Sequence, residues 1–205
     1  AWYGGYPSGS NYYEESQVKK YKYNPEKAKK LLEEIGFKDI DGDGILNWSE
    51  NTELAGKNLN IEVIVNQSQN ASVSAAEAMV PLLRKVGIEL KVKIVKSTIS
   101  QNRVNGGNFE FSISRIGSVI TPFHSMSDFG PVNDSAPSWH QAAAAGKRDL
   151  LPFEKEMREI MTDAKTTNST EKRLNMFKDV LNIYTKNLYS IGIYEVRRGV
   201  ALNTR

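Results

Sequence analysis

The sequence predicts an α/β fold built on a strand–helix–strand unit, and two observations support this prediction. Apolar and polar residues alternate at 59–65 and again at 89–94, which is the two-residue period of a strand. Between these stretches, residues 72–86 carry apolar side chains at helical spacing, and Gly87 follows as a stop signal. Because the connections are short, we expect two parallel strands joined by a right-handed crossover.

A helix with both ends marked precedes this unit. Asn24 can accept a hydrogen bond from a first-turn amide, and Pro25 suits the first helical position, which donates no intrahelical bond. Gly36 stands where a helix ends in the left-handed conformation. The apolar face of this helix, at positions i, i+3, i+4 and i+7, consists of Ala28, Leu31, Leu32 and Ile35.

Residues 39–50 match the twelve-residue calcium-loop pattern D-x-[DN]-x-[DN]-G-x5-E at every constrained position. The candidate ligands are Asp39, Asp41, Asp43, the carbonyl of Ile45, Asn47 and Glu50. Three carboxylates so close together repel one another unless a cation neutralises them, and hard oxygen ligands suit Ca²⁺. The alternative is an acidic surface turn, since Asp and Gly are also common turn residues. No helical pattern follows Glu50, so we expect a structural calcium clip rather than a calcium switch.

The remaining elements are a third strand and two late helices. Phe109, Phe111 and Ile113 alternate with polar residues and predict the strand, which follows a short helix at 98–105. One late helix is expected at 153–165, and Asn168 is expected to cap the next. Residues 1–23 are expected to form an extended arm, 114–152 a long loop, and 190–196 and 199–202 two further strands.

Composition excludes several classes of function. The net charge of +3 is small and its basic residues are mixed with acids, so nucleic acid is not an expected partner. Cysteine is absent, and the sequence has no apolar run long enough to span a membrane. Nucleotide-binding and catalytic motifs are also absent, and His124 and His140 match no metal-binding spacing. We therefore expect a protein that is not an enzyme.

Four segments resemble the extracellular solute-binding proteins of family 5, the binding components of ABC importers for peptides, nickel and oligosaccharides. The segment Y-N-P-E-K-A-K at 23–29, with Leu31, Leu32 and Gly36 after it, is similar to a characteristic stretch of that family. K-V-G-I at 85–88 and G-N-F-E at 107–110 are similar to two later steps of it. Residues 187–194 resemble the strand that returns to the first lobe in some members.

The resemblance implies that residues 1–205 form a single lobe, the second of a two-lobed protein. The fold would be one lobe of a type II periplasmic-binding protein, with a mixed sheet on the strand–helix–strand unit and flanking helices. Its function would be to capture an extracellular oligopeptide or oligosaccharide and deliver it to a membrane permease. Such a protein would be a monomer in the periplasm or at the cell surface, with its export signal outside this chain. The alternative functions are a calcium-dependent interaction module using residues 39–50 and a carboxylate-based hydrolase.

The expected ligand site lies in the loop after the third strand. In peptide-binding relatives this loop carries a Trp and an Asp, and the Asp holds the amino terminus of the ligand. Aligned on Pro122, this chain has Arg115 at the Trp position and Ser118 at the Asp position. A neutral Ser cannot balance a buried ammonium group, which favours a sugar or an acidic ligand paired with Arg115. Trp139 could stack on a sugar ring or cover the core.

Overall fold

The computed structural model describes residues 11, 13–114, 150–188 and 190–193. Within this range, residues 21–114 form one unit, here called the sheet unit. Residues 11–20 and 150–193 belong to a second, the helical unit. That residues 1–205 form a single lobe stays a prediction.

Three parallel strands form the sheet unit, in the order β2-β1-β3. The strands are β1 (Asn60–Asn66), β2 (Glu89–Val95) and β3 (Phe111–Ile113). Helix α2 (Asn70–Arg84) connects β1 to β2, and α3 (Ser97–Asn105) connects β2 to β3. The predicted strand–helix–strand unit with parallel strands is therefore confirmed. The described strands are all parallel, and an antiparallel strand of the predicted mixed sheet is not among the described residues.

The two connecting helices contact opposite faces of the sheet. Val63 and Val65 of β1 pack in one apolar cluster with Ala76 of α2. Glu62, which points to the other face because strand side chains alternate, meets Arg103 of α3. This arrangement follows from right-handed crossovers: the chain moves from β1 to β2 in one direction and from β2 past β1 to β3 in the other.

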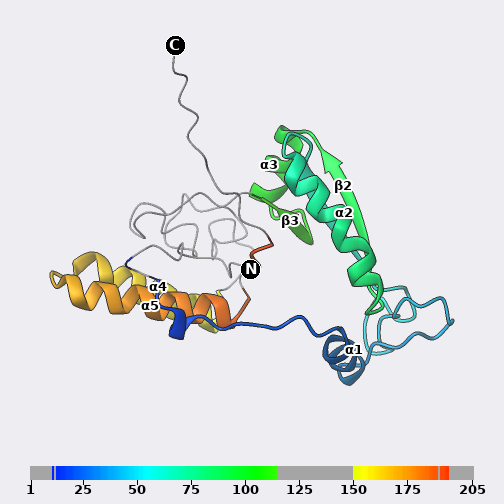
Figure 1. The fold of residues 1–205 in the computed structure, drawn as a ribbon, viewed down its shortest axis with the longest axis horizontal. Helices are drawn as coiled ribbons and strands as arrows, with labels where there is room; N and C mark the ends of the chain where they lie inside the picture. Colours follow the sequence, from blue (N-terminus) through cyan, green and yellow to red (C-terminus); the bar gives the residue numbers. More distant parts are fainter. Residues whose placement is uncertain (1–10, 12, 115–149, 189, 194–205) are drawn as a thin grey trace, which may run out of the picture. The chain divides into compact units, whose positions relative to one another are not determined.

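Because all three described strands run in the same direction, their amino ends lie together on one side of the sheet, here called the amino edge. Their carboxyl ends lie together on the opposite side, here called the carboxyl edge. The acidic loop 39–50 lies at the amino edge, beside the starts of β1 and β2 (Figure 1). The Leu46 amide donates to the Gly87 carbonyl at 2.8 Å, and the Leu59 amide donates to the Leu46 carbonyl at 2.6 Å. A seven-residue strand is roughly 20 Å long, so the acidic loop is separated from the carboxyl edge by the length of the sheet.

Helix α1 (Pro25–Glu34) has the ends that the sequence predicts. The Asn24 Oδ1 atom accepts a hydrogen bond from the Lys27 amide at 2.9 Å. Gly36 has a φ of +102°, and the amides of Gly36 and Phe37 donate to the carbonyls of Glu33 and Leu32. This pair of bonds is a Schellman ending. The apolar face of α1 remains largely exposed, and no residue of the helix is buried.

The helical unit is a pair of packed helices, α4 (Pro152–Thr166) and α5 (Thr170–Lys186) (Figure 1). Its core consists of Val18, Met157, Met161, Ala164, Phe177, Val180, Leu181 and Tyr184. The prediction that Asn168 caps the second helix is wrong. Ser169 is the cap, because its Oγ accepts a hydrogen bond from the Lys172 amide at 3.3 Å.

The described part of the expected arm is held to this helical unit. It contains one 3₁₀ turn, η1 (Glu15–Gln17), and Val18 is buried against α4 and α5. The Asn182 side chain donates to the Gln17 carbonyl at 2.9 Å, and the Lys19 amide donates to the Thr185 hydroxyl at 3.1 Å. At the other end, residues 190–193 form no strand, and the rest of the two predicted C-terminal strands lies outside the described residues.

Candidate functional site

The three predicted ligand-binding residues, Arg115, Ser118 and Trp139, lie outside the described residues. Their roles therefore stay predictions. The structure does show where the chain leaves the sheet before them. Strand β3 ends at Ile113, at the carboxyl edge, and the described chain stops one residue later at Ser114. In parallel α/β sheets, ligands bind outside the carboxyl ends of the strands. The carboxyl edge is therefore the place to look for a site.

A cluster of polar side chains occupies this edge, here called the edge cluster and defined as Asn66, Ser68 and Ser97. Asn66 is the last residue of β1, and Ser97 is the first residue of α3, two positions after β2 ends. The Asn66 Oδ1 atom accepts hydrogen bonds from the Ser68 amide at 3.0 Å and from the Ser68 and Ser97 hydroxyls at 2.9 Å each. The two hydroxyl oxygens lie 3.4 Å apart. Both serines are exposed, so a solute can reach their hydroxyls.

Two helices begin beside the edge cluster without side-chain caps. The capping positions are Gln69 for α2 and Lys96 for α3, and neither side chain bonds to a first-turn amide. Neither helix has an acidic residue in its first turn. The Ser72 amide of α2 donates to the Gln69 carbonyl at 2.9 Å. Other first-turn amides have no partner within their helix, so these starts offer hydrogen-bond donors next to the serine hydroxyls. The edge can therefore donate hydrogen bonds to a ligand and accept hydrogen bonds from it.

An ion-pair network lies on the face of the sheet that α3 contacts. The Arg103 Nη2 atom is 2.6 Å from Glu62 Oε1, and the Lys93 Nζ atom is 3.3 Å from Glu62 Oε2. The hydrogen bond from Arg103 is the main cause that lowers the pKa of Glu62 below its ordinary value, although partial desolvation opposes it. Arg103 Nε also donates to the Asn108 carbonyl at 2.8 Å, so this network ties β1 to the segment that enters β3.

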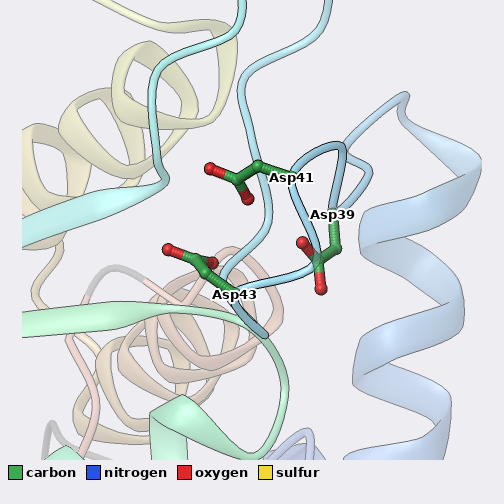
Figure 2. Close-up of side chains that lie close together, drawn as sticks. All are labelled: Asp39, Asp41 and Asp43. Atoms are coloured by element: carbon green, nitrogen blue, oxygen red, sulfur yellow. The ribbon is translucent and has the colours of Figure 1, made fainter.

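The acidic loop brings three of its six predicted ligands together. Carboxylate oxygens of Asp39, Asp41 and Asp43 lie within 4.8 Å of one another, and all three residues are exposed (Figure 2). Among the described residues, Glu50 is not part of this group. Backbone amides hold two of the carboxylates, because Asp39 accepts from Gly42 and Gly44, and Asp43 accepts from Ile45. The arrangement presents clustered oxygen ligands, and calcium binding stays a prediction.

Asn47, another predicted ligand, is used to hold the loop. Its side chain is buried. Its Oδ1 atom accepts from the Ile40 amide at 2.7 Å, and its Nδ2 atom donates to the Gly56 carbonyl and to Asn58 Oδ1. These bonds connect the loop to the segment that enters β1, which favours a structural role for Asn47. The Ile45 side chain is also buried.

Sequence reasoning missed the edge cluster, although a signal for it was present. Asn66 and Ser97 stand at the ends of two predicted parallel strands, and such ends meet at one edge of a sheet. The bonds between their side chains could not be read from the sequence. In the described part of the chain, no helix combines the length and the apolar character needed to cross a membrane.

Comparison with known proteins identifies the family of the chain. Residues 2–136 match the family model described as "Bacterial extracellular solute-binding proteins, family 5 Middle". The periplasmic alpha-galactoside-binding protein of Rhizobium meliloti is 28% identical over 98% of this chain. The oligopeptide-binding protein AppA of Bacillus subtilis is 29% identical over 88% of it. The chain spans 29% and 30% of the lengths of these two relatives.

A solved structure supports the same assignment. The periplasmic binding protein MelB of Agrobacterium fabrum, in complex with stachyose, is similar to this chain with a TM-score of 0.85 and 32% identity. The match covers 93% of this chain and 28% of that protein. The predicted periplasmic-binding-protein fold is thereby confirmed. The match to the family model extends over more than half of the sequence, and the chain belongs to the bacterial extracellular solute-binding proteins, family 5.

Proposed function

We propose that this chain is one lobe of the substrate-binding component of an ABC importer. The component captures an extracellular solute between two lobes and delivers it to a membrane permease. The observation that carries the proposal is the structural match over 93% of the chain to a periplasmic binding protein in complex with a sugar. The chain corresponds to less than a third of that protein, which supports a role as one part of a longer, two-lobed molecule.

The proposed solute is an oligosaccharide or an oligopeptide. One relative is named for alpha-galactosides and another for oligopeptides, and their identities to this chain are nearly equal. Sequence identity to these two relatives therefore does not show whether the solute is an oligosaccharide or an oligopeptide. Binding would need no chemical step, because capture and release require only hydrogen bonds and closure of the lobes.

Closure of the lobes is the proposed mechanism. A ligand shifts a protein toward its closed form only if it binds the closed form more tightly than the open one. The ligand must therefore contact both lobes, and the carboxyl edge of the sheet is the surface that this lobe would supply. Exposed hydroxyls and first-turn amides at that edge support this assignment. The proposed location is the periplasm or the cell surface, because one relative is named as periplasmic and the family is described as extracellular.

A thermal unfolding experiment on the full-length protein tests this function. Stachyose and an unmodified nonapeptide are each added at increasing concentration. A ligand present at one hundred times its dissociation constant stabilises a protein by about 2.7 kcal/mol. We expect at least one of the two to raise the melting temperature in a saturable way. If sugars and peptides across a broad panel leave the melting temperature unchanged, the proposed function is wrong.

A further inference from the structure

We infer that the edge cluster accepts hydrogen bonds from the ligand and so makes this lobe select neutral oligosaccharides over acidic ones, and that Asn66 is the positioning residue for this selectivity. The inference rests on the proposed function, because it concerns the solute that the same edge would contact. It is carried by the direction of the hydrogen bonds among Asn66, Ser68 and Ser97.

The orientation of the Asn66 amide is fixed by a backbone group. The Ser68 N–H lies 3.0 Å from one side-chain atom of Asn66, and a backbone N–H can only donate. The atom that it meets must therefore be the oxygen, Oδ1, because the alternative nitrogen carries only hydrogens. The same oxygen is the atom that both serine hydroxyls approach at 2.9 Å.

This orientation of the Asn66 amide determines whether the two serine hydroxyls can donate a hydrogen bond to a ligand or only accept one. Each hydroxyl has a single hydrogen, and in both serines it is directed to Asn66 Oδ1. The distance of 3.4 Å between the two hydroxyl oxygens is longer, so donation to Asn66 is the better bond for each. Only lone pairs then remain for a ligand. The edge cluster thus presents two neighbouring acceptors, and it accepts hydrogen bonds from a solute.

Two acceptors side by side select among the candidate solutes. A neutral sugar offers many hydroxyl hydrogens and can donate to both oxygens, while its own oxygens can accept from the nearby first-turn amides. A carboxylate carries only acceptors, so it could bond to the first-turn amides but not to the two serines, where its negative charge would face the lone pairs of Ser68 and Ser97. This argues against the acidic ligand that Arg115 suggests from the sequence, and it favours the sugar.

The experiment measures affinities of the full-length protein by calorimetry for stachyose and for tetragalacturonate, an acidic sugar of the same number of units. We expect wild type to prefer stachyose. Ser68→Ala and Ser97→Ala should each weaken stachyose binding by about tenfold, the usual effect of one hydrogen bond. Ser74→Ala is the matched control, because Ser74 is an exposed serine on α2 with no described hydrogen bond, and it should leave the affinity unchanged.

Two substitutions of Asn66 separate positioning from a merely structural role. Asn66→Asp keeps an oxygen that accepts from all three donors, so it should retain stachyose binding. Asn66→Leu frees both hydroxyl hydrogens for donation, so the preference for stachyose over tetragalacturonate should shrink at least fivefold. General destabilisation would weaken both ligands equally and leave that ratio unchanged.

The outcomes also separate this inference from the proposed function. If stachyose binds and both serine variants bind it like wild type, the inference is overturned and the function stands. Binding of a nonapeptide without binding of stachyose leads to the same conclusion. If wild type binds neither a sugar nor a peptide, the inference and the function fail together.

Discussion

Gly87 shows how a single residue connects the acidic loop to the sheet. Its φ is +82°, a conformation that glycine adopts without strain. A Cβ atom at this position would lie 2.5 Å from the Cγ atom of Leu46, whose side chain is buried. The carbonyl of Gly87 also accepts the Leu46 amide. Close packing and backbone conformation therefore both require glycine here.

We predict that Gly87→Ala destabilises the protein more than Gly56→Ala does. Gly56 has a similar φ of +73°, but a Cβ atom there would have no neighbour within 4 Å. Both variants suffer the backbone strain, of about 1–3 kcal/mol, and Gly87→Ala alone adds overpacking, of about 1–3 kcal/mol. Urea unfolding measures the difference. Equal losses in the two variants would show that Leu46 moves aside without cost.

We predict that the ionisation of Glu62 makes the folding stability of the protein depend on pH. Its pKa in the folded protein is lowered, first by the hydrogen bond from Arg103. A lowered pKa means that the ionised carboxylate stabilises the fold above the unfolded-state pKa, which is about 4.3. This contribution is lost as the pH falls through the lower, folded-state pKa. Glu62→Gln should therefore reduce stability at pH 7 and have little effect at the acid end of the range.

The measurement is the free energy of unfolding of both proteins from pH 7 down to pH 3. The control is Glu53→Gln, because Glu53 is exposed and has no ion pair among the described residues. If the Glu62→Gln and wild-type curves stay parallel at all pH values, folding does not lower the pKa of Glu62 and the prediction is wrong.

At the scale of single elements, two residues are candidates for the cap of α5. The capping-box spacing in the sequence favours Asn168, whereas the structure places the cap at Ser169. We predict that Ser169→Ala costs about 1 kcal/mol of unfolding free energy, as the loss of a helix cap usually does. Asn168→Ala, one residue earlier and exposed, should cost much less. The reverse order in a denaturation experiment would contradict the cap assignment.

The ends of elements show what could be predicted from the sequence. Asn24 and Gly36 were sufficient to place α1, since a cap and a left-handed ending are local features that depend on few neighbours. The alternation of residues 59–65 and 89–94 was sufficient for β1 and β2. At α5, Asn168 and Ser169 are both good caps, and local sequence cannot choose between them.

The candidate site was less predictable because its bonds cross between elements. Asn66 and Ser97 are far apart in the sequence, and their contact depends on the pairing of β1 with β2. Asn47 was expected as a metal ligand from its position in the calcium pattern. Its burial and its bonds to Ile40 and Gly56 depend on how residues 56–58 return to the loop, which the pattern does not contain.

The prediction for the acidic loop, residues 39–50, is that it binds Ca²⁺. We predict that Ca²⁺ raises the melting temperature and that Asp41→Ala removes this effect. Asp41 is the best test residue, because no hydrogen bond of its side chain occurs among the described residues, whereas Asp39 and Asp43 also hold backbone amides. Removing Asp41 therefore removes a ligand without dismantling the loop. Equal melting with Ca²⁺ and with a chelator would refute calcium binding.

The position of the loop gives the calcium prediction a second consequence. The loop lies at the amino edge and the edge cluster at the carboxyl edge, separated by the length of β1. Calcium should therefore stabilise the fold without entering the solute site. Stachyose affinity of the full-length protein should be the same with Ca²⁺ and with a chelator, provided that the protein is folded in both. A large change would place calcium at the solute site.

At the scale of the whole molecule, a lobe that acts by closure should bind poorly alone. The chain corresponds to 28% of a solved relative, and a ligand held between two lobes loses its contacts with the second lobe when that lobe is missing. The isolated 205 residues also retain an exposed apolar face on α1, with Leu31 50% and Ile35 67% exposed. Some of this surface would be available to other parts of a longer protein.

We therefore predict that the isolated chain binds stachyose at least a hundredfold more weakly than the full-length protein. Calorimetry on both proteins in the same buffer measures the ratio, and circular dichroism confirms that the isolated chain is folded. The difference in affinity arises because closure brings the ligand into contact with both lobes, and a single lobe cannot close. If the folded isolated chain binds as tightly as the full-length protein, its carboxyl edge is a complete site. Capture would then not require a second lobe.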